Sequence, residues 1–341
     1  MSLVQSRRAL LATAALLPLA GRPAEAAAAT APKRARHYYD RAAALAGDDP
    51  VLRAIVKALS PDFSVPDARA TTKTVAMPET KALGPLRIFD DVAVVGTSFV
   101  QATALLTAKG IILIDAMGSP DDAANIIVPG LRAVGADPAQ IKYVVVAHGH
   151  NDHFGGAQFL ADRYGARVMM SRTDWDLIAA ERPDHAPKHD LEIADGQRLT
   201  LGDTTVAFHH TPGHTPGTVS PIFPVHWKGR RHTAMLWGGT NPPTAIADKR
   251  TNLSSVLAFA ATMRRAGVEV ELNNHGGADY GLTRIEQLRA GTTGAANPFV
   301  IGRARAQRFM KVMEIMLRGR IAQDQETTPR PSPAAALPTC C

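Results

Sequence analysis

Three histidines and one aspartate lie within six residues of this chain, in the motif His148-Gly-His-Asn-Asp-His153. The motif directly follows an apolar run at 143–146, which is typical of a buried strand. Sheets of α/β proteins commonly hold ligands beyond the carboxyl ends of their strands, so we expect the motif to form a loop at such an edge. Imidazole and carboxylate groups are the ligands that zinc and similar divalent ions prefer. The motif therefore predicts a metal site built on an α/β sheet.

Two further histidines fit the same site. His214 lies in a Thr-Pro-Gly-His-Thr-Pro-Gly turn, after an alternating run at 205–209. Glycine and proline on both sides of the histidine indicate a stiff loop that aims one side chain. His275 lies in an Asn-Asn-His-Gly-Gly segment, straight after a strand candidate at 268–272. Because each segment follows a strand end, all three can meet on one rim and supply ligands for two ions.

The H-x-H-x-D-H motif, the TPGHTPG turn and the later histidine resemble the metallo-β-lactamase superfamily, over residues 85–318. The resemblance implies an αββα sandwich, in which two mixed β-sheets are flanked by helices, with two zinc ions in a groove at the sheet edges. It also implies which residues bind each ion. The first zinc would be bound by His148, His150 and His214, and the second by Asp152, His153 and His275.

The strand after the TPGHTPG turn separates the members of this superfamily. Many relatives, the glyoxalase II type among them, carry a bridging aspartate there, whereas 234–243 of this chain holds no acid. Two β-lactamase subclasses use a cysteine ligand, but the only cysteines here are Cys340 and Cys341. The ligand set therefore resembles the third subclass of class B β-lactamases. That subclass usually grips the drug carboxylate with an Asp-Ser pair and a further serine, where this chain has Gly-Gly-Thr-Asn at 238–241.

The resemblance implies a hydrolytic mechanism. Metal binding lowers the pKa of water from about 15.7 to about 7, and the resulting hydroxide would attack a cyclic amide carbonyl while Asp152 orients it. The leading hypothesis is a β-lactamase-like hydrolase that opens β-lactam rings. The alternative is a lactone, such as an acyl-homoserine lactone, or a thioester. Thr240, Asn241 and Tyr280 are candidate substrate contacts, although each could equally stabilise a loop. A non-catalytic binding protein would be expected to have lost ligands, and all six are present.

The first 26 residues are typical of an export signal. An arginine pair, Arg7-Arg8, precedes an apolar stretch at 9–20 and the small residues of 24–26, which favours the twin-arginine route over an ordinary secretory signal. The apolar stretch, about 12 residues long, is too short to span a bilayer, so we expect a periplasmic or secreted bacterial protein without stable membrane association. The net charge of +7 comes without Lys/Arg blocks. This pattern favours a small-molecule substrate over nucleic acid and leaves the oligomeric state open.

The remaining sequence predicts layered α/β architecture. Residues 27–84 form a leader and a helical extension, with helical spacing over 36–60, which could either cap the groove or simply pack on the side of the sandwich. Four short strands are expected next, then helices and further strands in alternation as far as about residue 317. From Gly319 onward the polar, proline-containing composition predicts a disordered tail. The expected strands are 86–90, 92–96, 102–107 and 111–115, and the expected helices that follow are 121–131 and 155–163.

Overall fold

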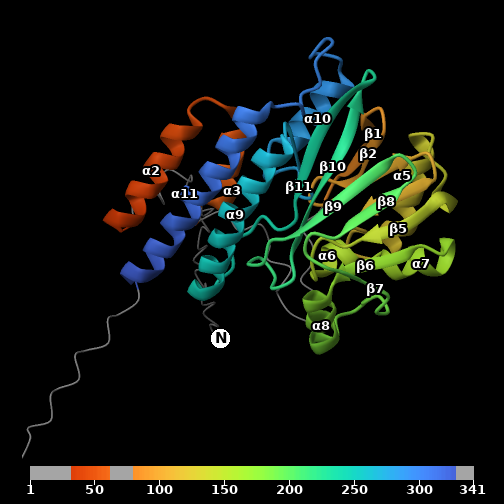
Figure 1. The fold of residues 1–341 in the computed structure, drawn as a ribbon, viewed down its shortest axis with the longest axis horizontal. Helices are drawn as coiled ribbons and strands as arrows, with labels where there is room; N and C mark the ends of the chain where they lie inside the picture. The colour runs from red at the N-terminus through yellow and green to blue at the C-terminus, as the bar shows by residue number, and fades with distance from the viewer. Residues whose placement is uncertain (1–31, 62–79, 328–341) are drawn as a thin grey trace, which may run out of the picture.

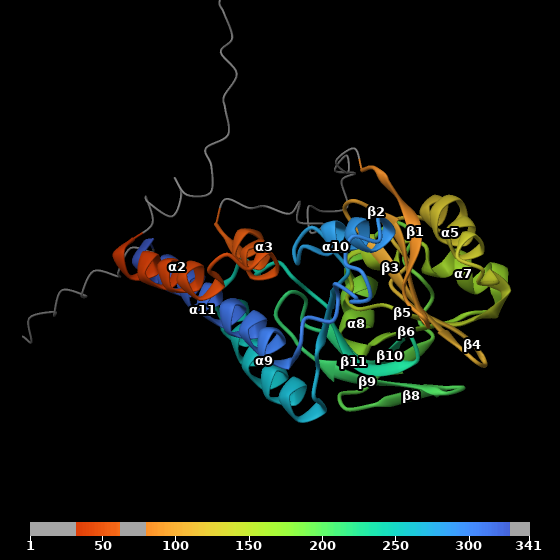
Figure 2. The same cartoon turned by 90° about the horizontal axis from the view of Figure 1, so that it is seen from above.

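A computed structural model describes residues 32–61 and 80–327 of the chain. Two β-sheets pack face to face, and helices cover the outer face of each sheet (Figures 1 and 2). This arrangement confirms the predicted αββα sandwich. The predicted export signal at 1–26 and the two terminal cysteines lie outside the described residues.

The first sheet has seven strands in the order of the chain. Its first four strands pair antiparallel, whereas the fourth to the seventh pair parallel, so the sheet is mixed. The edge strand begins before its predicted start and contains Pro85; an edge tolerates proline, which cannot donate to the ladder. The strands are β1 (Ala82–Phe89), β2 (Val92–Thr97), β3 (Gln101–Thr107), β4 (Gly110–Ile114), β5 (Ile141–Val145), β6 (Arg167–Ser171) and β7 (Leu191–Ile193).

The second sheet has five strands in the order β12-β11-β10-β9-β8. Only the pair of β11 and β12 is parallel within it, so both sheets are mixed as predicted. The loops that follow β5, β9 and β12 carry the histidines singled out in the sequence. The strands are β8 (Arg198–Leu201), β9 (Thr204–His210), β10 (Val219–Trp227), β11 (Arg230–Trp237) and β12 (Val270–Asn273).

Apolar side chains gather in three layers that correspond to the sandwich. One cluster fills the space between the sheets, where Phe208 and Phe223 of the second sheet meet Ile112 of the first. A second lies under the helices on the outer face of the first sheet, and a third joins the outer face of the second sheet to α9 (Ile246–Ala266) and α11 (Arg303–Thr327). Burial on both faces of each sheet supplies most of the driving force for this fold.

The helices on the first sheet are short. The helix predicted at 121–131 is present, because α4 (Pro120–Asp122), a π-helical segment at Ala123–Ile127 and α5 (Val128–Ala133) follow one another without a break. The predicted helix behind the metal motif is present as α7 (Ala157–Tyr164). Further helices are α6 (Asn151–Phe154), α8 (Arg172–Glu181), α10 (Gly281–Arg289) and the 3-10 turn Pro138–Gln140.

The N-terminal extension is helical, as the spacing over 36–60 predicts, and it consists of two helices. The chain turns at Gly47, whose φ of 53° suits glycine, between α2 (Lys33–Ala46) and α3 (Pro50–Leu59). Asp49 then caps α3 by accepting hydrogen bonds from the amides of Val51 and Leu52. Both helices pack against α11 on the side of the sandwich (Figure 2).

The disordered tail predicted from Gly319 is wrong for residues 319–327, which continue α11. Their polar side chains bind α2 instead of water: Gln323 accepts a 2.7 Å hydrogen bond from the hydroxyl of Tyr39, and Glu326 accepts from two amides at the start of α2. The polar composition therefore predicted disorder wrongly for this segment, because its polar groups have tertiary partners. None of the helices within the described ranges is both long and apolar enough to cross a membrane.

Candidate metal centre

The HGHNDH motif begins three residues after β5, at the carboxyl edge of the first sheet. Its second half is a helical turn, α6, so the prediction that the motif lies wholly in a loop is wrong. Asp152 and His153 lie on this turn and are buried, with exposed fractions of 3% and 0%. The turn places His148 and His150 on one side and Asp152 and His153 on the other, which divides the motif between two groups of ligands.

His148, His150 and His214 form the first group, whose ligand atoms all lie within 4.8 Å of one another. The Nδ1 atoms of His148 and His214 lie 2.6 and 2.8 Å from the carbonyl oxygens of Gly238 and Asn241. A carbonyl oxygen only accepts, so each Nδ1 donates the proton and each Nε2 of a neutral ring carries a lone pair. The two Nε2 atoms face each other at 3.1 Å. Two lone pairs at this distance repel each other, and a cation between them would instead be coordinated by both nitrogens.

The electrostatic environment keeps His148 neutral. Burial, followed by the charges of His153 and His214, lowers the pKa of His148 well below its usual value. A neutral imidazole is the form that binds metals. The carbonyl hydrogen bonds to Nδ1 also fix the ring orientation, as partners of metal-binding histidines do.

Asp152, His153 and His275 form the second group, and their ligand atoms also lie within 4.8 Å of one another. Oδ2 of Asp152 is 3.4 Å from Nε2 of His153 and 3.5 Å from Nε2 of His275. Within the described residues, Oδ1 of Asp152 and Nε2 of His153 are buried without a hydrogen-bond partner. Such orphaned atoms are costly in a folded protein unless an ion or water satisfies them.

Asp115 and Asn274 fix the second group through hydrogen bonds to its His153 and to each other. Oδ2 of Asp115 is 2.8 Å from Nδ1 of His153 and accepts a 3.0 Å bond from the Asn274 amide, while Oδ1 accepts from the amide of Ala147. Although burial opposes it, the carboxylates of Asp152 and Asp115 raise the pKa of His153 to about 10. Sequence reasoning missed Asp115; its signal was an acid directly after the apolar strand β4, which pairs with β5.

Asp174, which sequence reasoning also missed, joins the two loops that carry the first group. Its Oδ2 accepts hydrogen bonds from the amide of Gly149 at 2.7 Å and the hydroxyl of Thr215 at 2.6 Å. Its Oδ1 accepts from the amide of Gly217 at 2.8 Å. Burial raises the pKa of Asp174, and the three donors oppose that rise. One side chain of α8 thus fixes the spacing between the HGHNDH motif and the His214 turn.

The predicted substrate contacts occupy different positions. Thr240 is buried, and its hydroxyl forms hydrogen bonds with the side chain of Asn273, so it stabilises a loop. Asn241 supplies the carbonyl that orients His214. Tyr280 is half-buried and lines a cavity beside the loop that carries His275.

The glycine pair after β11 packs directly against the first group. A Cβ on Gly239 would lie 2.5 Å from Cβ of His214, and one on Gly238 would lie 2.0 Å from the carbonyl oxygen of Val219. These distances are far inside van der Waals contact. Gly239 therefore has no room for a side chain while His214 keeps this place, and Gly238 has none while Val219 keeps its place.

The two groups suit borderline divalent ions. Three imidazole nitrogens in one group, and one carboxylate with two imidazoles in the other, are donor sets that zinc accepts with a coordination position left for a small molecule. The orphaned atoms of the second group and the facing nitrogens of the first are the features that an ion would satisfy. The fold and the site thus define an αββα protein with a histidine-rich metal centre at its sheet edges.

Comparison with known proteins agrees with this class. The model of the metallo-β-lactamase superfamily matches residues 95–226. A hydroxyacylglutathione hydrolase of Anaeromyxobacter dehalogenans is 31% identical over 185 residues, which are 54% of this chain and 63% of that protein. The chain spans less than two thirds of the length of the curated relatives that it matches first.

Solved structures share the fold over most of the chain. The subclass B3 metallo-β-lactamase BJP-1 of Bradyrhizobium japonicum is 24% identical, with a TM-score of 0.59 over 72% of this chain and 97% of that one. A metallo-β-lactamase of Cronobacter sakazakii is 26% identical, with a TM-score of 0.61 over 72% and 96%. The family model over residues 95–226 and the shared fold make the chain similar to the metallo-β-lactamase superfamily in both sequence and structure.

Proposed function

We propose that this protein is an exported hydrolase with two zinc ions that opens cyclic amides of the β-lactam type. The observation that carries the proposal is the pair of ligand groups, one with facing imidazole nitrogens and one with orphaned buried atoms. The glycine pair after β11 supports the β-lactamase side of the superfamily, because it leaves no room for a bridging aspartate beside His214.

The side chains of the site have separate tasks in this reaction. When bound, two zinc ions would make a water more acidic and polarise the carbonyl of the substrate. His148, His150 and His214 would hold the first ion, and Asp152, His153 and His275 the second. Oδ1 of Asp152 has no partner among the described residues, so it can accept a hydrogen bond from the attacking water and orient it.

A second candidate function is hydrolysis of a thioester or lactone. The curated relatives support it, because those found first with a named activity are hydroxyacylglutathione hydrolases. The ligand groups serve either reaction equally, since both begin with attack of water on a carbonyl. The two candidates differ in the leaving group, which is an amide nitrogen in a β-lactam and a sulfur or oxygen in the alternatives.

The test is hydrolysis by purified zinc-loaded protein, with metal content measured on the same sample. We expect turnover of a chromogenic cephalosporin that is abolished by a chelator and restored by zinc. His148→Ala should lose both metal and turnover, whereas His37→Ala, which removes an exposed histidine outside the two groups, should keep both. Protein that holds two metals yet turns over only hydroxyacylglutathione or a homoserine lactone would overturn the β-lactam proposal in favour of the second candidate.

The location of the protein is a separate part of the proposal. The arginine pair, apolar stretch and small residues of 1–26 support export through the twin-arginine route. In a bacterial host, we expect mature protein in the periplasmic fraction and precursor retained in the cytoplasm when Arg7 and Arg8 are both changed to Lys. If the double variant were exported as well as the wild type, the twin-arginine route would be refuted.

A further inference from the structure

The turn between β2 and β3 of the first sheet contacts the His275 loop (residues 274–280) of the second sheet. Nδ1 of His275 lies 2.9 Å from the carbonyl oxygen of Phe99 in this turn, and the two rings meet edge to face with their centroids 4.9 Å apart. Because a carbonyl oxygen only accepts, Nδ1 donates its proton, and Nε2 of the neutral ring carries the lone pair that an ion would use. Nε2 lies 3.5 Å from Oδ2 of Asp152. The turn therefore sets both the tautomer and the direction of this ligand.

Gln101, the first residue of β3, binds the backbone on both sides of His275. Its amide N–H donates a 2.9 Å hydrogen bond to the carbonyl of Asn274. Its side-chain Oε1 accepts a 2.7 Å hydrogen bond from the amide of Gly276. Gln101 is 2% exposed, and its Nε2 donates to the carbonyl of Thr97 at the end of β2. One residue thus joins the His275 loop to the β2–β3 turn immediately before and immediately after the metal ligand.

The β2–β3 turn is fixed by hydrogen bonds of its own. Oγ1 of Thr97 accepts from the amides of Phe99 and Val100, both at 3.2 Å. The amide of Thr97 donates a 2.9 Å bond to the carbonyl of Val100. The strands on either side of the turn then pair antiparallel within the sheet. The turn is therefore a preformed support, on a rigid element, for a loop that comes from the other sheet.

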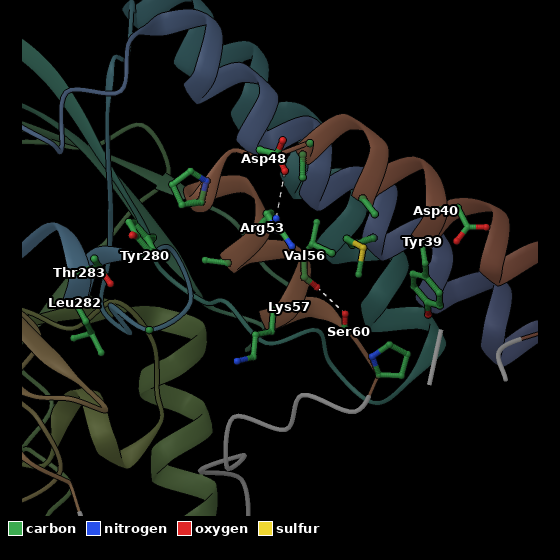
Figure 3. A pocket seen from close by; sticks show the side chains of 18 of the residues that line it. Tyr39, Asp40, Asp48, Arg53, Val56, Lys57, Ser60, Tyr280, Leu282 and Thr283 are labelled. Carbon is green, nitrogen blue, oxygen red and sulfur yellow. Dashed lines mark hydrogen bonds and ion pairs between the residues drawn. The ribbon is translucent and has the colours of Figure 1, made fainter. Parts of the chain in front are cut away.

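The His275 loop is packed closely on the side of Gln101 and faces a cavity on another side. A Cβ on Gly276 would lie 2.8 Å from Oε1 of Gln101, inside van der Waals contact, so glycine permits this approach. Gly276 and Tyr280 also line a cavity of about 1290 Å³, with Arg53 of α3 across it (Figure 3). Segments with few packing contacts open locally at low cost. The part of the loop after His275 therefore depends on its contact with Gln101.

The contacts of Gln101 concern one ligand group and not the other. Its side chain binds the β2–β3 turn and the His275 loop. The loops of the first group are joined by Asp174 instead. Loss of the Gln101 side chain should therefore weaken the second group and spare the first.

We propose that Gln101 is a positioning residue that sets the affinity of the second ion without touching it. Its Oε1 holds Gly276, and through it His275, where the ligand atoms of His275, Asp152 and His153 lie within 4.8 Å of one another. The proposal rests on the two-ion part of the proposed function and is independent of the substrate. It assigns control of the second ion to a residue outside the histidine-containing motifs.

Two substitutions separate the hydrogen bond of Gln101 from its size. Gln101→Met keeps the length of the side chain but replaces the amide with a thioether, which is a poor acceptor, whereas Gln101→Glu keeps an oxygen for the Gly276 amide. The metal-free protein is titrated with zinc in competition with a chromophoric chelator, and His275→Ala identifies the dissociation constant of the second group. In Gln101→Met, we expect that constant to rise by about 10–100-fold and the first to change by less than about threefold. Gln101→Glu should keep the second constant within about fivefold of the wild type.

Gln140→Met is the matched control, because it makes the same change at an exposed glutamine ahead of β5, and it should leave both constants unchanged. A general loss of stability would raise both constants together, so only a selective rise of the second supports the proposal. Two bound ions with an unchanged second constant in Gln101→Met would overturn the positioning role and leave the two-ion function intact. Equal losses in Gln101→Met and Gln101→Glu would overturn it as well. A wild type that binds only one ion would instead refute the two-ion function.

Hydrogen exchange at the Gly276 amide tests the same contact without any metal. In the metal-free protein, we expect this amide to exchange about tenfold faster in Gln101→Met than in the wild type, because its acceptor is gone and the loop opens more often. Gln101→Glu and Gln140→Met should keep the slow exchange. If the amide exchanged equally slowly in Gln101→Met, Gln101 would not be what holds the loop, and the proposal would fail.

Discussion

Asp174→Asn is the substitution that most directly tests how the first ligand group is assembled. The carboxylate of Asp174 accepts from the amides of Gly149 and Gly217, one on each oxygen, and also from the hydroxyl of Thr215. Asparagine has the same shape but only one oxygen. In either orientation of its amide, an NH₂ group must face one of the two backbone N–H groups.

The magnitude follows from what the substitution leaves unpaired. A buried donor without a partner costs about 1–3 kcal/mol, and the remaining bonds lose the assistance of the negative charge. We therefore expect Asp174→Asn to lower the free energy of unfolding by about 2–4 kcal/mol. Because Asp174 joins the loops of the HGHNDH motif and His214, we also expect zinc affinity to fall by about 10–100-fold, as for other outer partners of metal ligands.

The assay combines urea denaturation with zinc competition against a chromophoric chelator. Asp176→Asn is the matched control, because it makes the same change on the same helix at a largely exposed residue whose nearest cation is Arg172 at 3.9 Å. The control should stay within about 0.5 kcal/mol of the wild type. If Asp174→Asn behaved like Asp176→Asn in both assays, the carboxylate would not be what fixes the two loops.

Three further changes have definite expected outcomes. Gly239→Ala should displace His214 and reduce bound metal from two ions to one, by elemental analysis, whereas Gly277→Ala, whose Cβ meets nothing closer than 4.0 Å, should keep two; two ions in both would refute the packing argument. Asp49→Ala removes the cap of α3 and the ion pair with Arg305, so it should destabilise the protein by about 1–3 kcal/mol at neutral pH. Although burial opposes it, Arg305 and the α3 amides lower the pKa of Asp49, so this difference should shrink as the pH falls from about 4 through the lowered pKa, and a difference that stays constant over that fall would contradict the assignment. Removing metal with a chelator should lower Tm, because ions that bind only the folded state stabilise it; an unchanged Tm would argue against metal binding by the native fold.

The sequence predicted those parts of the molecule that depend on local pattern. The four strands between 86 and 115 were found because alternation and apolar runs reflect burial on a pleated sheet. The six histidine and aspartate ligand candidates were found because three histidines and an aspartate crowd into six residues and because each segment follows a strand. The structure brings all six together in two groups of three, as the resemblance implied.

Residues that act across long sequence separations were missed. Asp115 and Asp174 are single acids without a motif, and each reveals its role only when β4 lies beside β5 or α8 lies beside the His214 turn. The end of α11 was missed for the same reason. The polar side chains of Gln323 and Glu326 favoured a solvated tail, yet both bind α2, which lies about 290 residues earlier in the chain.

The glycine pair at 238–239 links the metal centre to the question of substrate. In the sequence, this pair lies where the third β-lactamase subclass usually has residues, serines among them, that bind the drug carboxylate. In the structure, the same glycines let His214 approach His148, and the carbonyl of Gly238 orients that histidine. A side chain that could bind substrate from this position would therefore displace a ligand. Recognition of an anionic substrate must then come from side chains elsewhere around the site.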